Sequence, residues 1–231
     1  MFGFFDPTYL FMVMIPSLVL SLGAQFFVQS AFAKWGKTRN TLGLTGVEVG
    51  ERIIRSAGLG GVQFEGIAGT MTDHYDPNGH IVRMSQDVAT RPSVAAMAIV
   101  AHELGHAQQH QENSILITAR TFLVPAMRFS PTLAYGLIIA GILFQATGLI
   151  WGGIAFFGVV VVFMLLTLPV EFDASRRGLK LLEQAGLMAG GQDRTGARQI
   201  LSAAALTYVA AFVSALLTLL YYISLAQRSS R

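Results

Sequence analysis

The chain has 231 residues, of which 53% are hydrophobic and 13% charged, with a net charge of +3 and a mean hydropathy of +0.54. Soluble domains carry about 25% charged residues, because a folded protein in water needs a polar surface. The composition therefore excludes an ordinary soluble enzyme, a disordered chain and a nucleic-acid binder, and it indicates an integral membrane protein. The chain contains no cysteine, so a bound metal would need His, Asp or Glu ligands.

Four transmembrane helices are expected, at about residues 8–32, 131–148, 152–168 and 200–225. The first apolar run has a cleaved signal peptide as its alternative, since an Ala-Phe-Ala sequence at 31–33 is typical of a cleavage site. However, the run is longer than a signal-peptide core and no Lys or Arg precedes it, which favours a retained helix. The block 131–168 has no charge, and glycines at 148, 152 and 153 predict a turn that divides it into a hairpin.

Basic residues are concentrated in two polar segments, with nine Lys and Arg in residues 34–130 and five in residues 169–199. The predicted hairpin tip has none. Because cytoplasmic loops carry an excess of Lys and Arg, both polar segments are expected on the cytoplasmic side and both termini outside, although Arg228 and Arg231 oppose this orientation. The expected fold is one mainly α membrane domain over residues 1–231, with a cytosolic region of helices and a small β-sheet.

The first polar segment contains several local structural signals. Thr45 and Glu48 have the spacing of a capping box, which predicts a helix that ends at Gly58. Residues 62–65 and 80–85 alternate between apolar and polar side chains, with an Asp-Pro-Asn-Gly turn sequence before the second run, so we expect a small antiparallel sheet. The sequence around Thr90–Pro92 predicts the start of a helix that continues through the Ala-rich residues 93–110.

That helix carries the sequence His102-Glu103-Leu104-Gly105-His106. Two His four residues apart lie on one face of a helix, so both imidazoles can bind one metal ion, and zinc suits such ligands. Glu103 lies beside this pair, where it can accept a proton from water and pass it to a leaving amine. The alternative is a structural pair of core histidines. Gly105 would allow another part of the chain to approach closely.

A catalytic zinc normally has three protein ligands, so a third is needed. Glu171 is the strongest candidate, because it directly follows the third predicted span, on a helix expected to begin near Pro169. A membrane hairpin returns the chain to the side it left, which places Glu171 on the side of His102 and His106. The alternative is an interfacial carboxylate that pairs with Arg176 or Arg177.

Several segments together resemble the YugP-type membrane zinc metallopeptidases of bacteria. They are the N-terminal span, the helix that ends at Gly58, and residues 73–77 (Asp-His-Tyr-Asp-Pro), 81–85, 102–108 and 168–177. More distantly, the chain is similar to the HtpX-type and prenyl-protein membrane proteases. The resemblance implies a gluzincin-like HExxH peptidase of the bacterial cytoplasmic membrane, with one Zn²⁺ on His102, His106 and Glu171 and with Glu103 as general base. The distant relatives place an Asp four residues after the ligand Glu, where this chain has Ser175, and the neighbouring acid is Asp173.

The Asp-His-Tyr-Asp-Pro segment has no secure role in the sequence. His74 or Tyr75 could donate a hydrogen bond to an oxyanion, whereas the preferred interpretation is that Asp73 and Asp76 shape a turn and Tyr75 packs. His80 and His110 are expected to be solvated. A substrate contact is the alternative for His110, because it lies on the same helix side as His106.

These features predict a zinc endopeptidase that is embedded in the lipid bilayer, with its site at the cytoplasmic face. Its substrate is expected to be a peptide or a membrane protein, and no nucleic-acid partner is expected. The strand 80–85 is hypothesised to form a sheet edge that pairs with an extended substrate. The alternative function is a zinc-containing membrane scaffold or chaperone-like module with little proteolytic activity. A transporter ranks last, because the last three predicted spans contain no charged residue.

Overall fold

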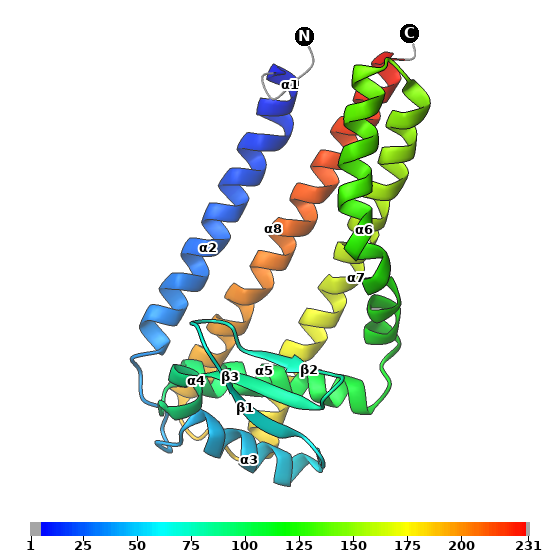
Figure 1. The fold of residues 1–231 in the computed structure, drawn as a ribbon. Coiled ribbons are helices and arrows are strands. Elements are labelled where there is room, and N and C mark those ends of the chain that lie inside the picture. Colours follow the sequence, from blue (N-terminus) through cyan, green and yellow to red (C-terminus); the bar gives the residue numbers. More distant parts are fainter. Residues whose placement is uncertain (1–5, 230–231) are drawn as a thin grey trace. The chain divides into compact units, whose positions relative to one another are not determined.

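A computed structural model describes residues 6–229 of the chain, so Arg231, one of the two charges that oppose the expected orientation, lies outside the described residues. The chain divides into two compact units. One contains Met1–Ala24, Thr118–Pro169 and Leu206–Arg231, and the other contains Gln25–Ile117 and Val170–Ala205. Figure 1 shows the elements in chain order. The single domain over the whole chain stays a prediction.

The helices confirm a mainly α membrane protein. Within residues 6–229, four helical segments are long and apolar enough to cross a membrane. They are Pro7–Trp35, which comprises α1 (Pro7–Tyr9), the π-helical turn η1 (Leu10–Met14) and α2 (Ile15–Trp35), then α6 (Ile115–Leu143), α7 (Thr147–Gln184) and α8 (Gly191–Ser229). Asp6 caps the first of these, because its carboxylate accepts a hydrogen bond from the Thr8 backbone N–H at 2.9 Å.

The predicted position of the α6–α7 turn is wrong. The chain reverses at residues 144–146, where Gln145 has φ +53° and the Ala146 N–H donates to the Gly141 carbonyl at 2.8 Å. Two glycines instead lie where the helices pack closely. A Cβ at Gly153 would lie 2.7 Å from the Ala134 carbonyl oxygen, and one at Gly141 would lie 2.8 Å from the Ile150 backbone nitrogen. These two glycines serve helix packing rather than the turn.

Helices α6 and α7 also have different bounds from the prediction. Helix α6 begins at Ile115 and includes Arg120, Arg128 and Pro131, so the second span does not start at residue 131. Helix α7 continues through Pro169 to Gln184, so Glu171 does not lie on a separate helix. At 1.5 Å per residue α7 is about 57 Å long, nearly twice the thickness of the hydrocarbon core. Its first part, residues 147–168, is free of charge, and all its charged residues follow Pro169.

The second unit contains a three-stranded mixed sheet rather than the expected antiparallel one. Strand β3 (Ile81–Ser85) lies in the centre, parallel to β1 (Gln63–Ile67) on one side and antiparallel to β2 (His74–Asp76) on the other. Both backbone edges of β3 are therefore used for pairing within the sheet, which removes the hypothesis that this strand pairs with a substrate. Alternation in a sequence predicts a strand but not its partner, because pairing depends on contacts between distant residues.

Three helices pack with this sheet in the second unit. The capping box of α3 (Gly46–Ala57) is present, and Gly58 ends that helix with φ +65°, both as predicted. Helix α4 (Gln86–Thr90) is a separate short helix, so Thr90–Pro92 does not begin the long one. Helix α5 (Val94–Gln111) starts at Ser93, whose hydroxyl accepts a hydrogen bond from the Ala96 N–H. The core of the unit includes Val49, Ile53, Val82, Met84, Leu104, Leu181 and Leu182.

Candidate metal centre

Helix α5 and the charged part of α7 approach each other closely within the second unit. Gly105 lies against the backbone carbonyl of Ala174, in a space that a Cβ would fill. On the other helix, a Cβ at Gly178 would lie 2.8 Å from the Ala101 carbonyl oxygen. Small residues at both contact points let the two backbones meet, as the sequence indicated for Gly105. This contact places residues 102–106 next to residue 171.

Three candidate ligands converge at this contact. The Glu171 Oε2 atom lies 3.3 Å from His102 Nε2 and 3.5 Å from His106 Nε2, and ligand atoms of the three residues all lie within 4.8 Å of one another. A tetrahedral zinc site with ligands at about 2.0–2.1 Å separates neighbouring ligand atoms by about 3.4 Å. The three side chains are mostly buried, with exposed fractions of 13%, 12% and 4% for His102, His106 and Glu171. The two imidazoles and the carboxylate therefore fit a zinc ion.

The other ring nitrogen of each histidine has a partner of its own. His106 Nδ1 lies 3.0 Å from the Gln109 side-chain oxygen, and His102 Nδ1 lies 3.3 Å from the Ser175 hydroxyl. Contacts of this kind hold the ring of a metal-binding histidine in place. Ser175 thus contacts His102 from the position where the distant relatives have an Asp. With Nδ1 engaged on each ring, Nε2 is the atom that faces Glu171.

Glu103 lies beside these residues and is buried, with 8% of its surface exposed. Burial raises the pKa of its carboxyl group, whereas the neighbouring imidazoles of His102 and His106 act to lower this pKa. The Tyr75 backbone N–H donates a hydrogen bond to Glu103 Oε2 at 2.9 Å. A carboxyl group with a raised pKa and a fixed orientation suits a general base that accepts and then returns a proton.

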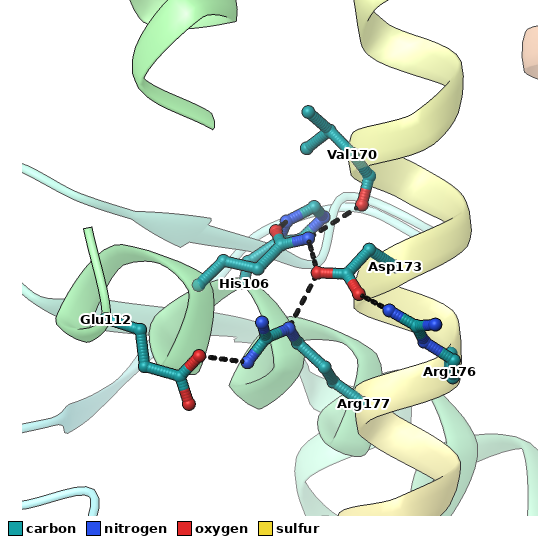
Figure 2. Close-up of polar contacts among 7 residues, drawn as sticks. His106, Glu112, Val170, Asp173, Arg176 and Arg177 are labelled. Atoms are coloured by element: carbon teal, nitrogen blue, oxygen red, sulfur yellow. Dashed lines mark hydrogen bonds and ion pairs between the residues drawn. The ribbon is translucent and has the colours of Figure 1, made fainter. Parts of the chain in front are cut away.

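The two arginines that follow Glu171 contact a different carboxylate. Arg176 and Arg177 both pair with Asp173, and Arg177 also contacts Glu112 at 2.6 Å (Figure 2). Asp173 thus takes both arginines, whereas Glu171 lies against His102 and His106. Asp173 in turn accepts a hydrogen bond from the Gln109 side-chain nitrogen at 2.8 Å.

The segment that contains Tyr75 combines turn formation with contacts to two histidines. Asp76 shapes a turn as predicted, because it accepts from the Asn78 N–H and pairs with Arg83, and the hydrogen bond from Arg83 lowers the pKa of its carboxyl group. Asp73 instead accepts from the Ser85 N–H and hydroxyl. The Tyr75 hydroxyl lies 2.6 Å from His80 Nδ1 and 3.2 Å from His110 Nδ1. The sequence predicted only solvation for these two histidines. His74 is exposed, and its Nδ1 atom contacts the Thr72 carbonyl.

The sequence interpretation did not identify three contacts around the candidate ligands. It assigned no role to Gln109, it noted Ser175 only as a departure from the distant relatives, and it left Asp173 without a partner. Gln109 is three residues after His106, a helical spacing that brings side chains together, so its proximity could have been predicted. The contact between Ser175 and His102 could not, because it depends on how two distant helices pack.

We expect Gly105→Ala to destabilise the second unit by about 1–3 kcal/mol, because the new methyl group would overlap the Ala174 carbonyl and push the helices apart. Zinc binding should also weaken, because the two helices that carry the candidate ligands would move apart. Denaturant unfolding and chelator competition would measure the two effects. Gly60→Ala is the matched control, since a Cβ there meets no atom within 4 Å. A Gly105→Ala protein that is more stable than the wild type would contradict the close approach, because without a clash alanine favours a helix by up to about 1 kcal/mol over glycine.

Comparison with known proteins is consistent with this site. A family described as "Putative neutral zinc metallopeptidase" matches residues 10–227. The chain is 41% identical over 209 residues to a protein of Bacillus subtilis (strain 168) described as "Putative membrane protease YugP", and the match covers 90% of this chain and 92% of that protein. No solved structure matches the chain. The chain belongs to the "putative neutral zinc metallopeptidase" family, as the resemblance of its sequence segments implied.

Proposed function

We propose that the protein is a membrane-embedded zinc endopeptidase, with zinc held by His102, His106 and Glu171 and with Glu103 as general base. The observation that carries this proposal is the convergence of two imidazole nitrogens and one carboxylate beside a buried glutamate. Membership in a zinc metallopeptidase family and the similarity to a protein described as a membrane protease support it.

The proposal includes a location and a class of substrate. The four apolar helices would cross the bacterial cytoplasmic membrane, and the basic residues of the two polar segments favour a site that faces the cytoplasm. The substrate would be a peptide or a membrane protein. Because α5 and the charged part of α7 carry the site, it would lie next to the membrane rather than within the hydrocarbon core.

In the proposed reaction, Glu103 and Tyr75 have separate roles. When bound, zinc supplies a Lewis acid that polarises a carbonyl group and lowers the pKa of water to about 7. Glu103 accepts a proton from the water whose oxygen forms a bond to the peptide carbon. Glu103 then transfers that proton to the amine nitrogen as the carbon–nitrogen bond breaks, which leaves a carboxylic acid, with the second proton of the water, and an amine. The Tyr75 N–H holds Glu103 Oε2 and so orients the carboxylate for both transfers.

Metal removal tests the proposal. Protein purified in detergent should contain about one zinc ion per chain and should cleave an unfolded protein such as β-casein. Treatment with 1,10-phenanthroline should reduce cleavage to background, and added Zn²⁺ should restore it. The products can be followed by mass spectrometry of the new chain ends. Cleavage that persists after complete metal removal, or protein without bound zinc, would contradict the zinc peptidase proposal.

A further inference from the structure

We propose that Gln109 is a positioning residue that keeps the proton of His106 on Nδ1, so that Nε2 presents its lone pair toward the metal site. The inference rests on the proposed metal centre, which uses His106 Nε2 as a ligand. It concerns a residue outside the HExxH motif, on the last turn of α5. Gln109 is fully buried, with an exposed fraction of 0%.

Two acceptors determine which way the Gln109 amide faces. Its side-chain nitrogen lies 2.9 Å from the Val170 carbonyl oxygen and 2.8 Å from Asp173 Oδ2. A backbone carbonyl can only accept a hydrogen bond, and so can an ionised carboxylate. The amide NH₂ group must therefore face these two oxygens, which leaves the amide oxygen on the side of His106.

Two arginines hold the Asp173 carboxylate in place beside Gln109. Arg176 and Arg177 both donate to this carboxylate, and Arg177 is held from its other side by Glu112 (Figure 2). The Val170 carbonyl, which can only accept, lies beside the same Gln109 nitrogen. These two groups of α7 together set the orientation of the buried amide.

The orientation of the amide then selects the tautomer of His106. The Gln109 oxygen lies 3.0 Å from His106 Nδ1, and an amide oxygen can only accept, so the proton of the ring must be on Nδ1. The neutral ring then has its lone pair on Nε2, the atom that lies 3.5 Å from Glu171 Oε2. His102 has no such restriction, because the Ser175 hydroxyl at its Nδ1 can donate or accept. The two histidines of the motif therefore differ in how their protons are controlled.

Three variants separate tautomer control from a packing role. Gln109→Met removes the acceptor and retains most of the side-chain volume. Gln109→Glu keeps an oxygen that can accept from His106 Nδ1, and a carboxyl group there can share a proton with Asp173. Gln111→Met changes a glutamine on the exposed end of the same helix and serves as the matched control.

Two measurements are needed, and the first does not require metal. In metal-free protein labelled with ¹⁵N-histidine, at a pH high enough for the ring to be neutral, two-bond ¹H–¹⁵N spectra should show His106 protonated on Nδ1 in the wild type, Gln109→Glu and Gln111→Met. Gln109→Met should populate the tautomer with the proton on Nε2. In chelator competition, Gln109→Met should bind Zn²⁺ about 10–100-fold more weakly than the wild type, as expected when the hydrogen-bond partner of a metal-binding histidine is removed. Gln109→Glu should lie much closer to the wild type.

The outcomes distinguish this inference from the proposed function. If the wild type binds no zinc, the metal centre itself is wrong, whereas the His106 tautomer in the metal-free protein still tests the role of Gln109. If the wild type binds zinc and Gln109→Met keeps both the tautomer and the affinity, the inference is wrong and the metal centre stands. An equal loss of affinity in Gln109→Met and Gln109→Glu, with no change of tautomer, would assign Gln109 to packing and overturn the inference. Should Gln109→Met fail to fold, the tautomers of the wild type and Gln109→Glu decide the result.

Discussion

Glu103→Gln is expected to lower the rate of peptide cleavage by about 10²–10⁴-fold while the protein keeps its zinc. The substitution removes the group that accepts the proton from water but leaves the three ligands unchanged. The amide oxygen of the substituted side chain can still accept the hydrogen bond from the Tyr75 N–H, so the local structure should persist. The measurement is the initial cleavage rate of the unfolded substrate, with zinc content determined on the same preparation.

The control for this change is His102→Ala, which should lose both zinc and cleavage. A Glu103→Gln protein that cleaves at the wild-type rate would remove Glu103 from the reaction. In cells, the same pair of variants tests the scaffold alternative. If His102→Ala produces a phenotype and Glu103→Gln produces none, the zinc site serves a structural or binding role and the peptidase proposal is wrong.

Loss of a residue that hydrogen-bonds to a metal ligand weakens metal binding by roughly 10–100-fold. Glu171→Gln changes a proposed ligand itself, so we expect it to weaken zinc binding by more than this. The substitution preserves size and removes the negative charge that lies 3.3 Å and 3.5 Å from the two imidazole nitrogens. Cleavage at saturating substrate should fall with zinc occupancy and recover in part when Zn²⁺ is added in excess. Chelator competition gives the affinity, and a titration of activity against free Zn²⁺ gives the recovery.

A matched control lies on the same helix. Glu183→Gln changes an exposed carboxylate that pairs with Arg194, and it should leave zinc affinity and cleavage unchanged. If Glu171→Gln binds zinc as tightly as the wild type while His102→Ala does not, the third ligand must be another residue. In that case His102 and His106 would still be ligands, and another acidic side chain would have to be the third.

Much of the candidate site follows from local sequence rules. The four-residue spacing of His102 and His106 places both on one helix face, and this geometry does not depend on the rest of the fold. The capping box at Thr45 and Glu48 and the left-handed Gly58 were also predictable, because each depends on hydrogen bonds within a few residues. Glu171 required one further assumption, namely that a membrane hairpin returns the chain to the side it left.

The errors in the sequence interpretation share a different physical origin. The glycines near residue 150 were assigned to a turn, yet Gly153 faces the Ala134 carbonyl, and a sequence does not show whether a glycine provides backbone freedom or close packing. The strand 81–85 was correctly located but wrongly assigned to a sheet edge. Its two partners are chosen by side-chain packing between segments distant in the chain.

The amino-acid sequence by itself determined that the protein has four apolar helices and an HExxH helix, because hydrophobicity and helical periodicity are properties of consecutive residues. Only the tertiary structure decided which side chains surround the candidate ligands. The packing of Gly105 against Ala174 brings α7 to α5, and with it Glu171, Ser175 and the Asp173–Gln109 contact behind His106. These contacts join residues more than 60 positions apart, so they depend on packing that no local pattern encodes.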